Sequence, residues 1–330
     1  MLKLNCLAVV AAVLIAGPLH AQDVHVRVSA AFTGTTASSD EYPTIQRALD
    51  HAPQPGPAGR LYILITPGTY HERVMVTQNR PRTTLIGTGA DPQSVVISAS
   101  QNARSAGGTF FTSTVEVSGD AFEADNLTFE NAAGNTGQAV AITVRSDRAV
   151  FKRCRFLGDQ DTLFSDFGRQ YFLDAYIQGG VDFIFGNSTA VFDNSEIHII
   201  RPGYLTAQSR VSPEQKTGFV FHHARVTAED LNGRSFYLGR PWRPFSRVVF
   251  LNSELPASLS AQGWSPWEPG GSIGDAYYAE RDSVGPGAHA QSRLAGSHQL
   301  SAAEAAPFAT ETFLAGADHW NPVAEAAKLP

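Results

Sequence analysis

The sequence of 330 residues predicts an all-β solenoid of stacked parallel coils, because it contains an internal repeat and many short strands separated by turn residues. The repeat reads aromatic, two variable residues, a small residue, one variable residue and an apolar residue. Five clear copies begin at Phe151, Phe172, Phe192, Phe221 and Phe250, and a degenerate copy occupies residues 124–129. Spacings of 21, 20, 29 and 29 residues between these phenylalanines are typical of units that bury their apolar faces against neighbouring copies.

The first 21 residues have the pattern of a secretory signal peptide. Lys3 precedes an apolar run over residues 7–17, and small residues follow, with cleavage expected after Ala21. The run is short for a membrane span. We therefore expect a signal peptide over residues 1–21, one domain over residues 22–330, and a soluble protein that is periplasmic or secreted and has no membrane partner.

Cysteine content and charge narrow the class of protein further. Cys6 lies in the leader, so Cys154 is alone in the mature chain and no internal disulfide is expected. Cys154 fills the small position of the repeat, which favours a core role over a nucleophilic one. The short leader, the single cysteine and the lack of a long pro-region look bacterial. Removing Lys3 from 25 basic residues leaves 24 against 31 acidic residues, and this acidic balance argues against a nucleic-acid partner.

The elements before the repeats fit the same architecture. Residues 43–50 carry an early proline and apolar positions at Ile45, Ala48 and Leu49, which predicts a short amphipathic helix that covers the open end of the solenoid. Short β-branched runs over residues 61–65, 83–86, 95–97 and 114–117 lack Asn-Gly turns between them. Parallel coils therefore suit them better than hairpins.

After the repeats the pattern changes twice. Residues 255–292 are rich in Pro, Gly, Trp and Tyr, which predicts a long excursion that builds a binding face. From Ser301 onward the sequence predicts one or two short helices packed back over the coils.

Two aspartates occupy the same position in consecutive repeats. Asp161 lies ten residues after Phe151, and Asp182 lies ten residues after Phe172. If each repeat is one coil, their backbones are about 5 Å apart. Like charge at that distance raises the pKa of one carboxyl, so one can serve as an acid while the other is a nucleophile, as a hydrolase requires. The alternative is that both are ordinary turn residues.

Several ordered segments resemble the signature blocks of pectin methylesterases. These are residues 68–72, 137–141, 160–163, 182–186 and 238–242, followed by similar later segments at 205–210, 263–267 and 278–288. The resemblance extends over about residues 40–322. It implies a right-handed parallel β-helix that hydrolyses the methyl esters of galacturonate units in pectin (homogalacturonan) and releases methanol, with no cofactor and no metal.

The resemblance also implies the roles of five side chains. Asp182 is expected to attack the ester carbonyl, and Asp161 is expected to protonate the leaving methoxide and then activate water. Gln138 and Gln160 would donate hydrogen bonds to the oxyanion, and Arg240 would orient Asp182. These roles are physically sensible, because a cation keeps a carboxylate nucleophile ionised and neutral amides stabilise new negative charge. The member of the pair without the cation, Asp161, should have the raised pKa.

Aromatic and charged residues near these blocks are candidates for substrate binding. Apolar platforms for sugar rings are expected from Trp242, Phe185, Phe164, Trp264 and Trp267. Arg201 is expected to bind a free galacturonate carboxylate, and Thr114 to line the other side of the cleft. Phe164 replaces a usual tyrosine of the family block and Asp159 a usual aromatic residue, and the extra carboxylate would disfavour demethylated units nearby. Tyr70 and Glu72, although in a signature block, are expected to be structural.

Other readings of this sequence stay open. A glycoside hydrolase of the inverting type would need carboxyls roughly 6.5–9.5 Å apart, and a lyase would need a calcium site, for which the sequence has no dense acidic cluster. Neither GxSxG nor HExxH occurs. A catalytically silent β-helix that binds polysaccharide or belongs to the cell envelope is the alternative from another class. We expect the protein to act as a monomer.

Overall fold

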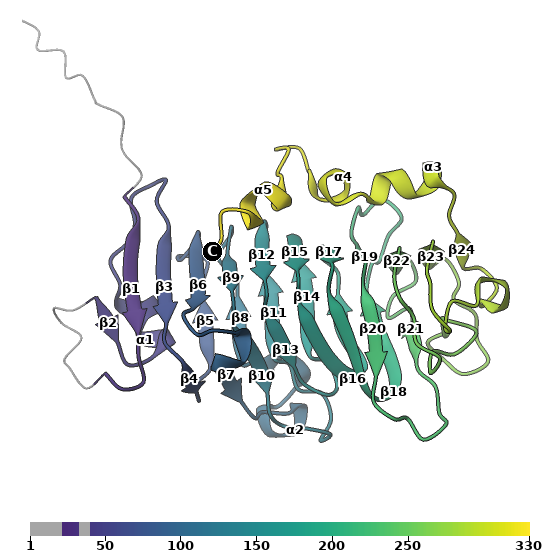
Figure 1. The fold of residues 1–330 in the computed structure, drawn as a ribbon, viewed down its shortest axis with the longest axis horizontal. Coiled ribbons are helices and arrows are strands. Elements are labelled where there is room, and N and C mark those ends of the chain that lie inside the picture. The colour runs from purple at the N-terminus through teal and green to yellow at the C-terminus, as the bar shows by residue number, and fades with distance from the viewer. Residues whose placement is uncertain (1–21, 33–39) are drawn as a thin grey trace, which may run out of the picture.

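The computed structural model describes residues 22–32 and 40–330, so the predicted signal peptide lies outside the described residues. This part of the chain winds into an elongated parallel β-helix whose coils follow one another along the long axis (Figure 1). Neighbouring coils pair strand to strand in parallel, for example Val150 opposite Tyr171.

One sheet of twelve strands runs the full length of the solenoid. We call it the first sheet. In spatial order its strands are β2 (Glu41–Tyr42), β1 (Val24–Val28), β3 (Leu61–Ile65), β6 (Thr83–Gly87), β9 (Glu123–Asp125), β12 (Ala149–Lys152), β15 (Arg169–Leu173), β17 (Thr189–Asp193), β19 (Gly218–His222), β22 (Arg247–Leu251), β23 (Tyr277–Arg281) and β24 (His298–Gln299).

The remaining strands form two further faces, joined by the long strands β16 (Tyr176–Gly186) and β18 (Glu196–Gln208), which pair with both. The second face consists of β4 (Gly68–Tyr70), β7 (Val95–Ala99), β10 (Thr128–Asn131), β13 (Arg155–Leu157), the first halves of β16 and β18, and β20 (Arg225–Ala228). The third face consists of β5 (Val74–Val76), β8 (Val115–Val117), β11 (Ile142–Arg145), β14 (Leu163–Phe167), the second halves of β16 and β18, and β21 (Tyr237–Gly239).

The predicted repeat is confirmed, since its phenylalanines are register partners in the first sheet. Phe151, Phe172, Phe192, Phe221 and Phe250 stack in one buried column with successive ring-centroid distances of 4.9, 4.6, 4.6 and 4.3 Å. Ala124 pairs with Phe151, so the degenerate copy is also a coil. Stacked aromatic rings add to the apolar burial that holds the coils together.

The turn that follows each stacked phenylalanine has a left-handed backbone conformation that the repeat did not predict. The second variable residue has positive φ, between 49° and 59°, in six coils: Asn126, Arg153, Asp174, Asn194, His223 and Asn252. Asn, Asp and His tolerate this left-handed conformation better than other side chains. The small residue that follows is buried, and burial raises the pKa of the Cys154 thiol, in agreement with its predicted core role.

The four strands predicted before the repeats are present as β3, β6, β7 and β8. The predicted excursion over residues 255–292 is only partly correct. Its middle enters the first sheet as β23, where Ala279 pairs with Val249, and Trp264 is buried in the core. This segment therefore continues the solenoid as a further coil.

The predicted N-terminal helix is α1 (Ile45–His51), which packs at the N-terminal end of the solenoid (Figure 1). The Glu72 carboxylate accepts hydrogen bonds from the backbone N–H groups of Ile45 and Gln46 at 2.9 and 3.0 Å, and so caps this helix. Tyr70 is buried and donates to the Val28 carbonyl oxygen at 3.3 Å. The structural interpretation of Tyr70 and Glu72 is confirmed.

The C-terminal segment returns across the outer side of the first sheet (Figure 1). Phe308, Leu314 and Trp320 pack there against outward-facing valines such as Val191 and Val220. The predicted short helices are thus present, and they pack back over the coils as expected. The remaining helices are α2 (Ala103–Ala106), α3 (Ala302–Ala305), α4 (Thr310–Leu314) and α5 (Pro322–Ala326), with 3-10 turns η1 (Pro92–Ser94), η2 (Thr109–Phe111), η3 (Ala290–Ser292) and η4 (Ala306–Phe308).

The helices of residues 22–32 and 40–330 are short, with at most seven residues. No helix in these ranges is long and apolar enough to cross a membrane. They also contain no group of three or more His, Cys, Asp or Glu side chains placed to hold a metal ion.

Candidate active site

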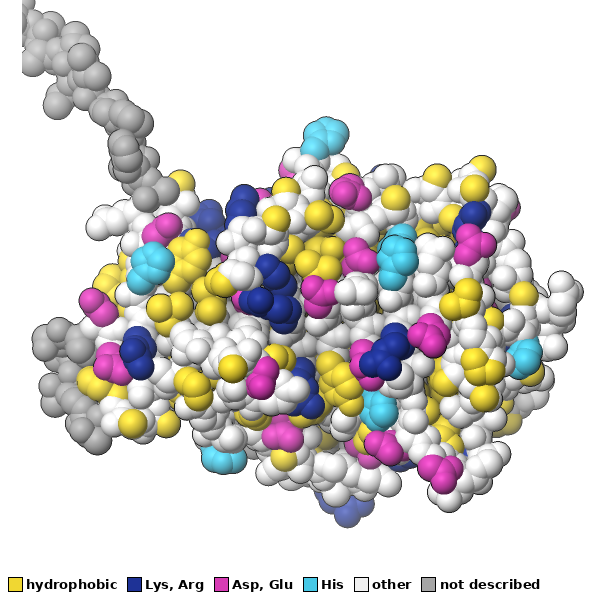
Figure 2. Space-filling model, in the orientation of Figure 1, with side chains coloured by type: hydrophobic (Ala, Val, Ile, Leu, Met, Phe, Trp, Pro, Cys, Tyr) yellow, Lys and Arg dark blue, Asp and Glu magenta, His cyan; other side chains and the backbone are white. Residues whose placement is uncertain are grey.

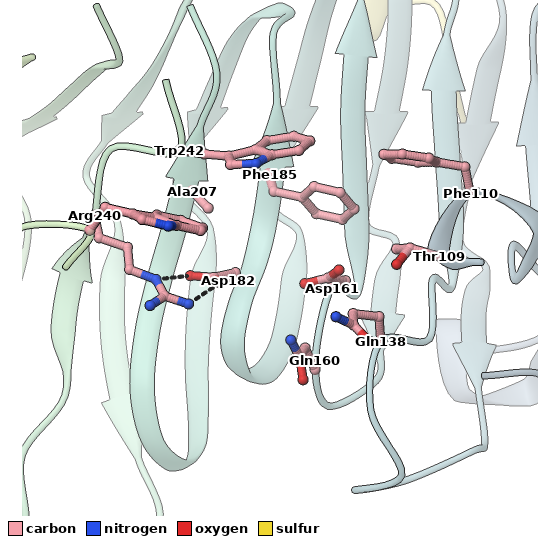
Figure 3. A pocket seen from close by; sticks show the side chains of 11 residues that line it. Thr109, Phe110, Gln138, Gln160, Asp161, Asp182, Phe185, Ala207, Arg240 and Trp242 are labelled. Atoms are coloured by element: carbon pink, nitrogen blue, oxygen red, sulfur yellow. Dashed lines mark hydrogen bonds and ion pairs between the residues drawn. The ribbon is translucent and has the colours of Figure 1, made fainter. Parts of the chain in front are cut away.

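A cleft with a volume of about 360 Å³ lies on the outer side of the third face. Its walls come from the third-face strands, from the loop that contains α2 and η2, and from the segments that follow β21 (Figure 3). The lining residues are Thr109, Phe110, Gln138, Gln160, Asp161, Asp182, Phe185, Ala207, Arg240, Trp242 and Trp267.

The structure brings Asp161 and Asp182 together on adjacent coils, as the repeat predicted. The Asp161 N–H donates to the Val181 carbonyl oxygen at 3.1 Å, and Leu163 pairs with Ile184 just beyond the two aspartates. Both have positive φ, 64° for Asp161 and 51° for Asp182. Both side chains point into the cleft (Figure 3). Backbone conformations that favour few residue types are concentrated at functional sites, and here they turn two carboxyls toward one space.

Arg240 holds Asp182 through two hydrogen bonds. Its Nε donates to Oδ1 at 2.9 Å and its Nη2 donates to Oδ2 at 2.6 Å, a bidentate pair at a largely buried site. The guanidinium lies between two aromatic rings, 4.0 Å from the ring centre of Tyr204 and 4.2 Å from that of Trp267. These cation–π contacts fix the plane of the guanidinium and therefore the orientation of Asp182.

Burial and neighbouring charge affect the pKa values of the two carboxyls differently. Burial raises the pKa of Asp161 well above its ordinary value, and the negative charge of Asp182 raises it further. Burial also raises the pKa of Asp182, but the hydrogen bonds and positive charge of Arg240 oppose this rise. The arrangement therefore favours a protonated Asp161 beside an ionised Asp182.

Gln138 and Gln160 are neighbours in the stack, because Gln138 pairs with Gln160 and Gln160 pairs with Val181. Their side chains lie close to Asp161 at the floor of the cleft (Figure 3). The Ala103 N–H donates to the Gln138 carbonyl oxygen at 2.8 Å and ties the α2 loop to this coil. Two side chains with amide donors thus lie beside the aspartates in the cleft.

Three of the predicted aromatic platforms, Trp242, Phe185 and Trp267, line the cleft. Phe164 lies beside Phe185 on the neighbouring strand, with stacked rings 4.6 Å apart, and lines an adjoining pocket that shares Phe110 and Trp242 with the cleft. Phe110 faces the cleft from the α2 loop and is 46% exposed (Figure 3).

The sequence did not identify Tyr204, Thr109, Phe110 or Ala207. Tyr204 is one residue away from the 205–210 block, and an aromatic residue beside that block is the only signal for it. The α2 loop carries no repeat position, so sequence alone gave no reason to place Thr109 and Phe110 near the aspartates.

Two of the predicted substrate residues are fully buried away from the cleft. Thr114 is fully buried, and its hydroxyl donates to the Glu130 carbonyl oxygen at 2.8 Å. Trp264 is also fully buried and stacks on Tyr278 inside the solenoid, with ring centres 4.3 Å apart. Both predictions are wrong, because these side chains point into the packed interior of the coil.

Arg201 is placed differently from the prediction. Its Nε donates to Asp159 Oδ1 at 2.6 Å, so its guanidinium already has a carboxylate partner, and it does not line the cleft. The same ion pair offsets the negative charge of Asp159, which was expected to disfavour demethylated units. Arg201 therefore compensates the charge of the unusual carboxylate Asp159.

The fold and the site together define a parallel β-helix protein whose aromatic cleft holds two carboxyl groups. The model of the family described as Pectinesterase matches residues 16–317. The chain belongs to the pectinesterase family, a family of carboxylic ester hydrolases.

Individual relatives agree with this assignment. The chain is 39% identical over 287 residues to pectinesterase 31 of Arabidopsis thaliana, covering 84% of this chain and 89% of that protein. It is 37% identical to probable pectinesterase/pectinesterase inhibitor 36 of the same plant, covering 85% of this chain but only 56% of the longer relative.

Solved structures show the same architecture. Pectin methylesterase from carrot has a TM-score of 0.83 and 33% identity, covering 92% of this chain and 96% of that one. Pectin methylesterase PemA from Erwinia chrysanthemi has a TM-score of 0.73 and 28% identity, covering 90% and 98%. The predicted right-handed parallel β-helix is confirmed. The higher similarity to plant proteins gives no support to a bacterial type.

Proposed function

We propose that this chain removes methyl groups from methyl-esterified galacturonate units of pectin and releases methanol, with Asp182 as the nucleophile. Membership of the pectinesterase family supports the reaction. The observation that carries the assignment of residues is the bidentate Arg240–Asp182 pair beside a second buried carboxyl, Asp161, whose pKa is raised.

In the first step Asp182 attacks the ester carbonyl carbon, and the carbonyl oxygen becomes an oxyanion. Gln138 and Gln160, which line the cleft, would donate hydrogen bonds to this oxyanion, and each such donor is typically worth a few kcal/mol in the transition state. The tetrahedral species collapses, the bond to the methoxy oxygen breaks, and Asp161 gives its proton to that oxygen. Methanol leaves, and the galacturonyl group remains joined to Asp182 as an anhydride.

In the second step Asp161, now ionised, takes a proton from a water molecule that attacks the anhydride. Hydrolysis frees a galacturonic acid, whose carboxyl gives its proton to solvent, restores the ionised Asp182 and leaves Asp161 protonated. The raised pKa of Asp161 suits it to both roles, because a group that titrates nearer to the working pH can give and take a proton readily.

The aromatic rim supports a sugar substrate. Trp242 and Phe185 offer apolar faces beside the aspartates, Phe110 faces them from the α2 loop, and Trp267 also lines the cleft. The cleft volume of about 360 Å³ is within the roughly 300–1,000 Å³ range of small-ligand sites, so one sugar unit fits at the centre of a longer chain.

We also propose that residues 22–330 form the mature catalytic domain, exported by the leader over residues 1–21 to the periplasm or beyond the cell. The leader and the single cysteine of the mature chain are the only grounds for a bacterial source. The protein is proposed to act as a monomer, since every side chain named in the mechanism comes from one chain. Size-exclusion chromatography tests this point.

The function is tested by incubating the mature protein with methylated pectin and measuring methanol, new reducing ends and unsaturated products separately. We expect methanol alone, and we expect Asp182→Asn to abolish its release. New reducing ends would indicate a glycosidase, and unsaturated products would indicate a lyase. No reaction with a folded wild-type protein would favour the catalytically silent β-helix.

Asp174→Asn is the matched control for this experiment. Asp174 has φ 52°, like Asp182, but lies at an outer corner of the coil, where the next coil has Asn194. This variant is expected to keep full methanol release. Equal losses in both variants would show that the Asp182 effect comes from the backbone and not from lost chemistry.

A further inference from the structure

A second pocket lies where the C-terminal segment crosses the first sheet, and it shares no lining residue with the cleft. Its volume is about 380 Å³. The lining residues come from the loop between β18 and β19, the starts of β22 and β23, and the C-terminal segment: Arg210, Lys216, Arg247, Tyr277, Pro307, Phe308, Thr312 and Phe313.

Three cations and no carboxylate line this pocket. Among the residues that the structure describes, Arg210, Lys216 and Arg247 form no ion pair, whereas several arginines elsewhere do, as Arg225 does with Glu196. Figure 2 shows the usual arrangement on one face of the molecule, where acidic and basic side chains lie next to one another. A concentration of unpaired positive charge is unusual in a chain with a net charge of −6.

Arg210 is 6% exposed, and its Nε has no hydrogen-bond partner among the described residues. Its Nη2 donates to the Pro213 carbonyl oxygen. The acid whose charge acts on it, Glu214, is fully exposed and accepts a hydrogen bond from the Ser212 hydroxyl. A buried cation with an unused donor costs free energy unless an anion completes the site.

Arg247 lies close enough to Arg210 to feel its charge and is half-buried. Burial and the positive charge of Arg210 lower the pKa of Arg247 to about 10. Its backbone N–H donates to Gln208 Oε1 at 2.9 Å, so the strand position is fixed while the side chain faces the pocket. Two like charges held together in this way are stabilised when a negative charge lies between them.

We propose that this pocket binds the carboxylate of a uronic acid unit in a demethylated, acidic oligosaccharide. The three cations suit a carboxylate, while the rings of Tyr277 and Phe313 and the Thr312 hydroxyl suit the sugar that carries it. The choice of a uronate rests on the proposed function, because that reaction produces galacturonate carboxylates. A polyanion is repelled by the net negative chain and needs such a local basic site to be retained.

The inference is tested by calorimetric titration of the full chain with a fully demethylated galacturonate trimer. We expect two binding events. Trp242→Ala should remove the event at the cleft, and Arg247→Gln should weaken the other by about tenfold or more, since hydrogen bonds to charged groups carry it. Lys216→Gln, at an exposed position, should also weaken the second event. The control Arg225→Gln, which removes a surface ion pair, should change neither.

Melting temperature without ligand gives the second measurement. Arg247→Gln should melt no lower than the wild type, because it removes an unpaired cation, and it should lose the rise in melting temperature that the trimer produces. A lower melting temperature together with lost binding would mean a structural arginine and would contradict the inference.

Two further outcomes would overturn it. One is an unchanged second binding event in both Arg247→Gln and Lys216→Gln. The other is Arg247-dependent binding of inorganic phosphate or sulfate with none of the trimer, which would assign the pocket to an inorganic anion. Because the trimer carries no ester, failure here is separate from failure of methanol release.

Discussion

Asp161 and Asp182 have the same backbone conformation and differ in their partners. Both are buried at positive φ, but only Asp182 is paired with a guanidinium. The repeat was sufficient to predict that the two lie on neighbouring coils. It did not predict the sandwich of Arg240 between Tyr204 and Trp267, because these residues come from separate coils and their contact depends on how far each loop extends.

We predict that Asp161→Asn makes the protein more stable at neutral pH while abolishing activity. A carboxyl whose folded pKa is raised binds more protons in the native state than in the unfolded state. Its contribution to stability is therefore present at low pH and lost as pH rises through the raised pKa. Asparagine tolerates the positive φ of Asp161 and carries no charge, so a gain of about 0.5–2 kcal/mol is expected near pH 8.

The measurement is the free energy of unfolding of wild type and Asp161→Asn as a function of pH. The difference between them should shrink as pH falls toward 4, where both carry a neutral side chain. A variant that is less stable than the wild type at pH 8, or a difference that does not depend on pH, would contradict this account of Asp161.

Within each coil, the phenylalanine column and the corner that follows it are the elements that repeat. The sequence revealed the column because aromatic residues recur in phase. It described the corner residues as variable, although four of the six at positive φ are Asn or Asp: Asn126, Asp174, Asn194 and Asn252. The preference is not visible in the sequence because Arg153 and His223 occupy this position in two copies. The corner constrains the backbone and leaves the side chain free to differ.

We predict that Phe192→Ala lowers the free energy of unfolding by about 3–5 kcal/mol, because it opens a cavity between the rings of Phe172 and Phe221. Phe167→Ala is the control, since Phe167 is 63% exposed, and it should change stability by no more than about 0.5 kcal/mol. Urea denaturation followed by circular dichroism measures both. Similar values for the two variants would show that the column does not hold the coils together.

The whole molecule depends on the C-terminal segment that covers the first sheet. The residue before each column phenylalanine is apolar, as in Val150, Tyr171, Val191, Val220 and Val249, and faces outward because strand side chains alternate. An apolar outer face needs a cover. This pattern could have shown which side the last helices pack against, whereas their path depends on contacts between residues far apart in the sequence.

We predict that Trp320→Ala destabilises the protein by about 3 kcal/mol or more. Trp320 packs in the apolar cluster between the C-terminal segment and the first sheet, and Arg169 stacks on its ring. Val323→Ala, in the same segment but 39% exposed, serves as the control and should have a small effect. Thermal unfolding with an apolar dye reports both stability and exposure of the first sheet. An unchanged melting temperature in Trp320→Ala would mean that the tail unfolds independently of the coils.

In the mechanism Asp161 is protonated while Asp182 is ionised. Carbon NMR titration of the aspartate carboxyls measures this directly. Asp161 should titrate well above the ordinary range and above Asp182. Its pKa should fall in Asp182→Asn, which removes the neighbouring charge, and the pKa of Asp182 should rise in Arg240→Gln. An Asp161 that titrates in the ordinary range, or below Asp182, would contradict the account.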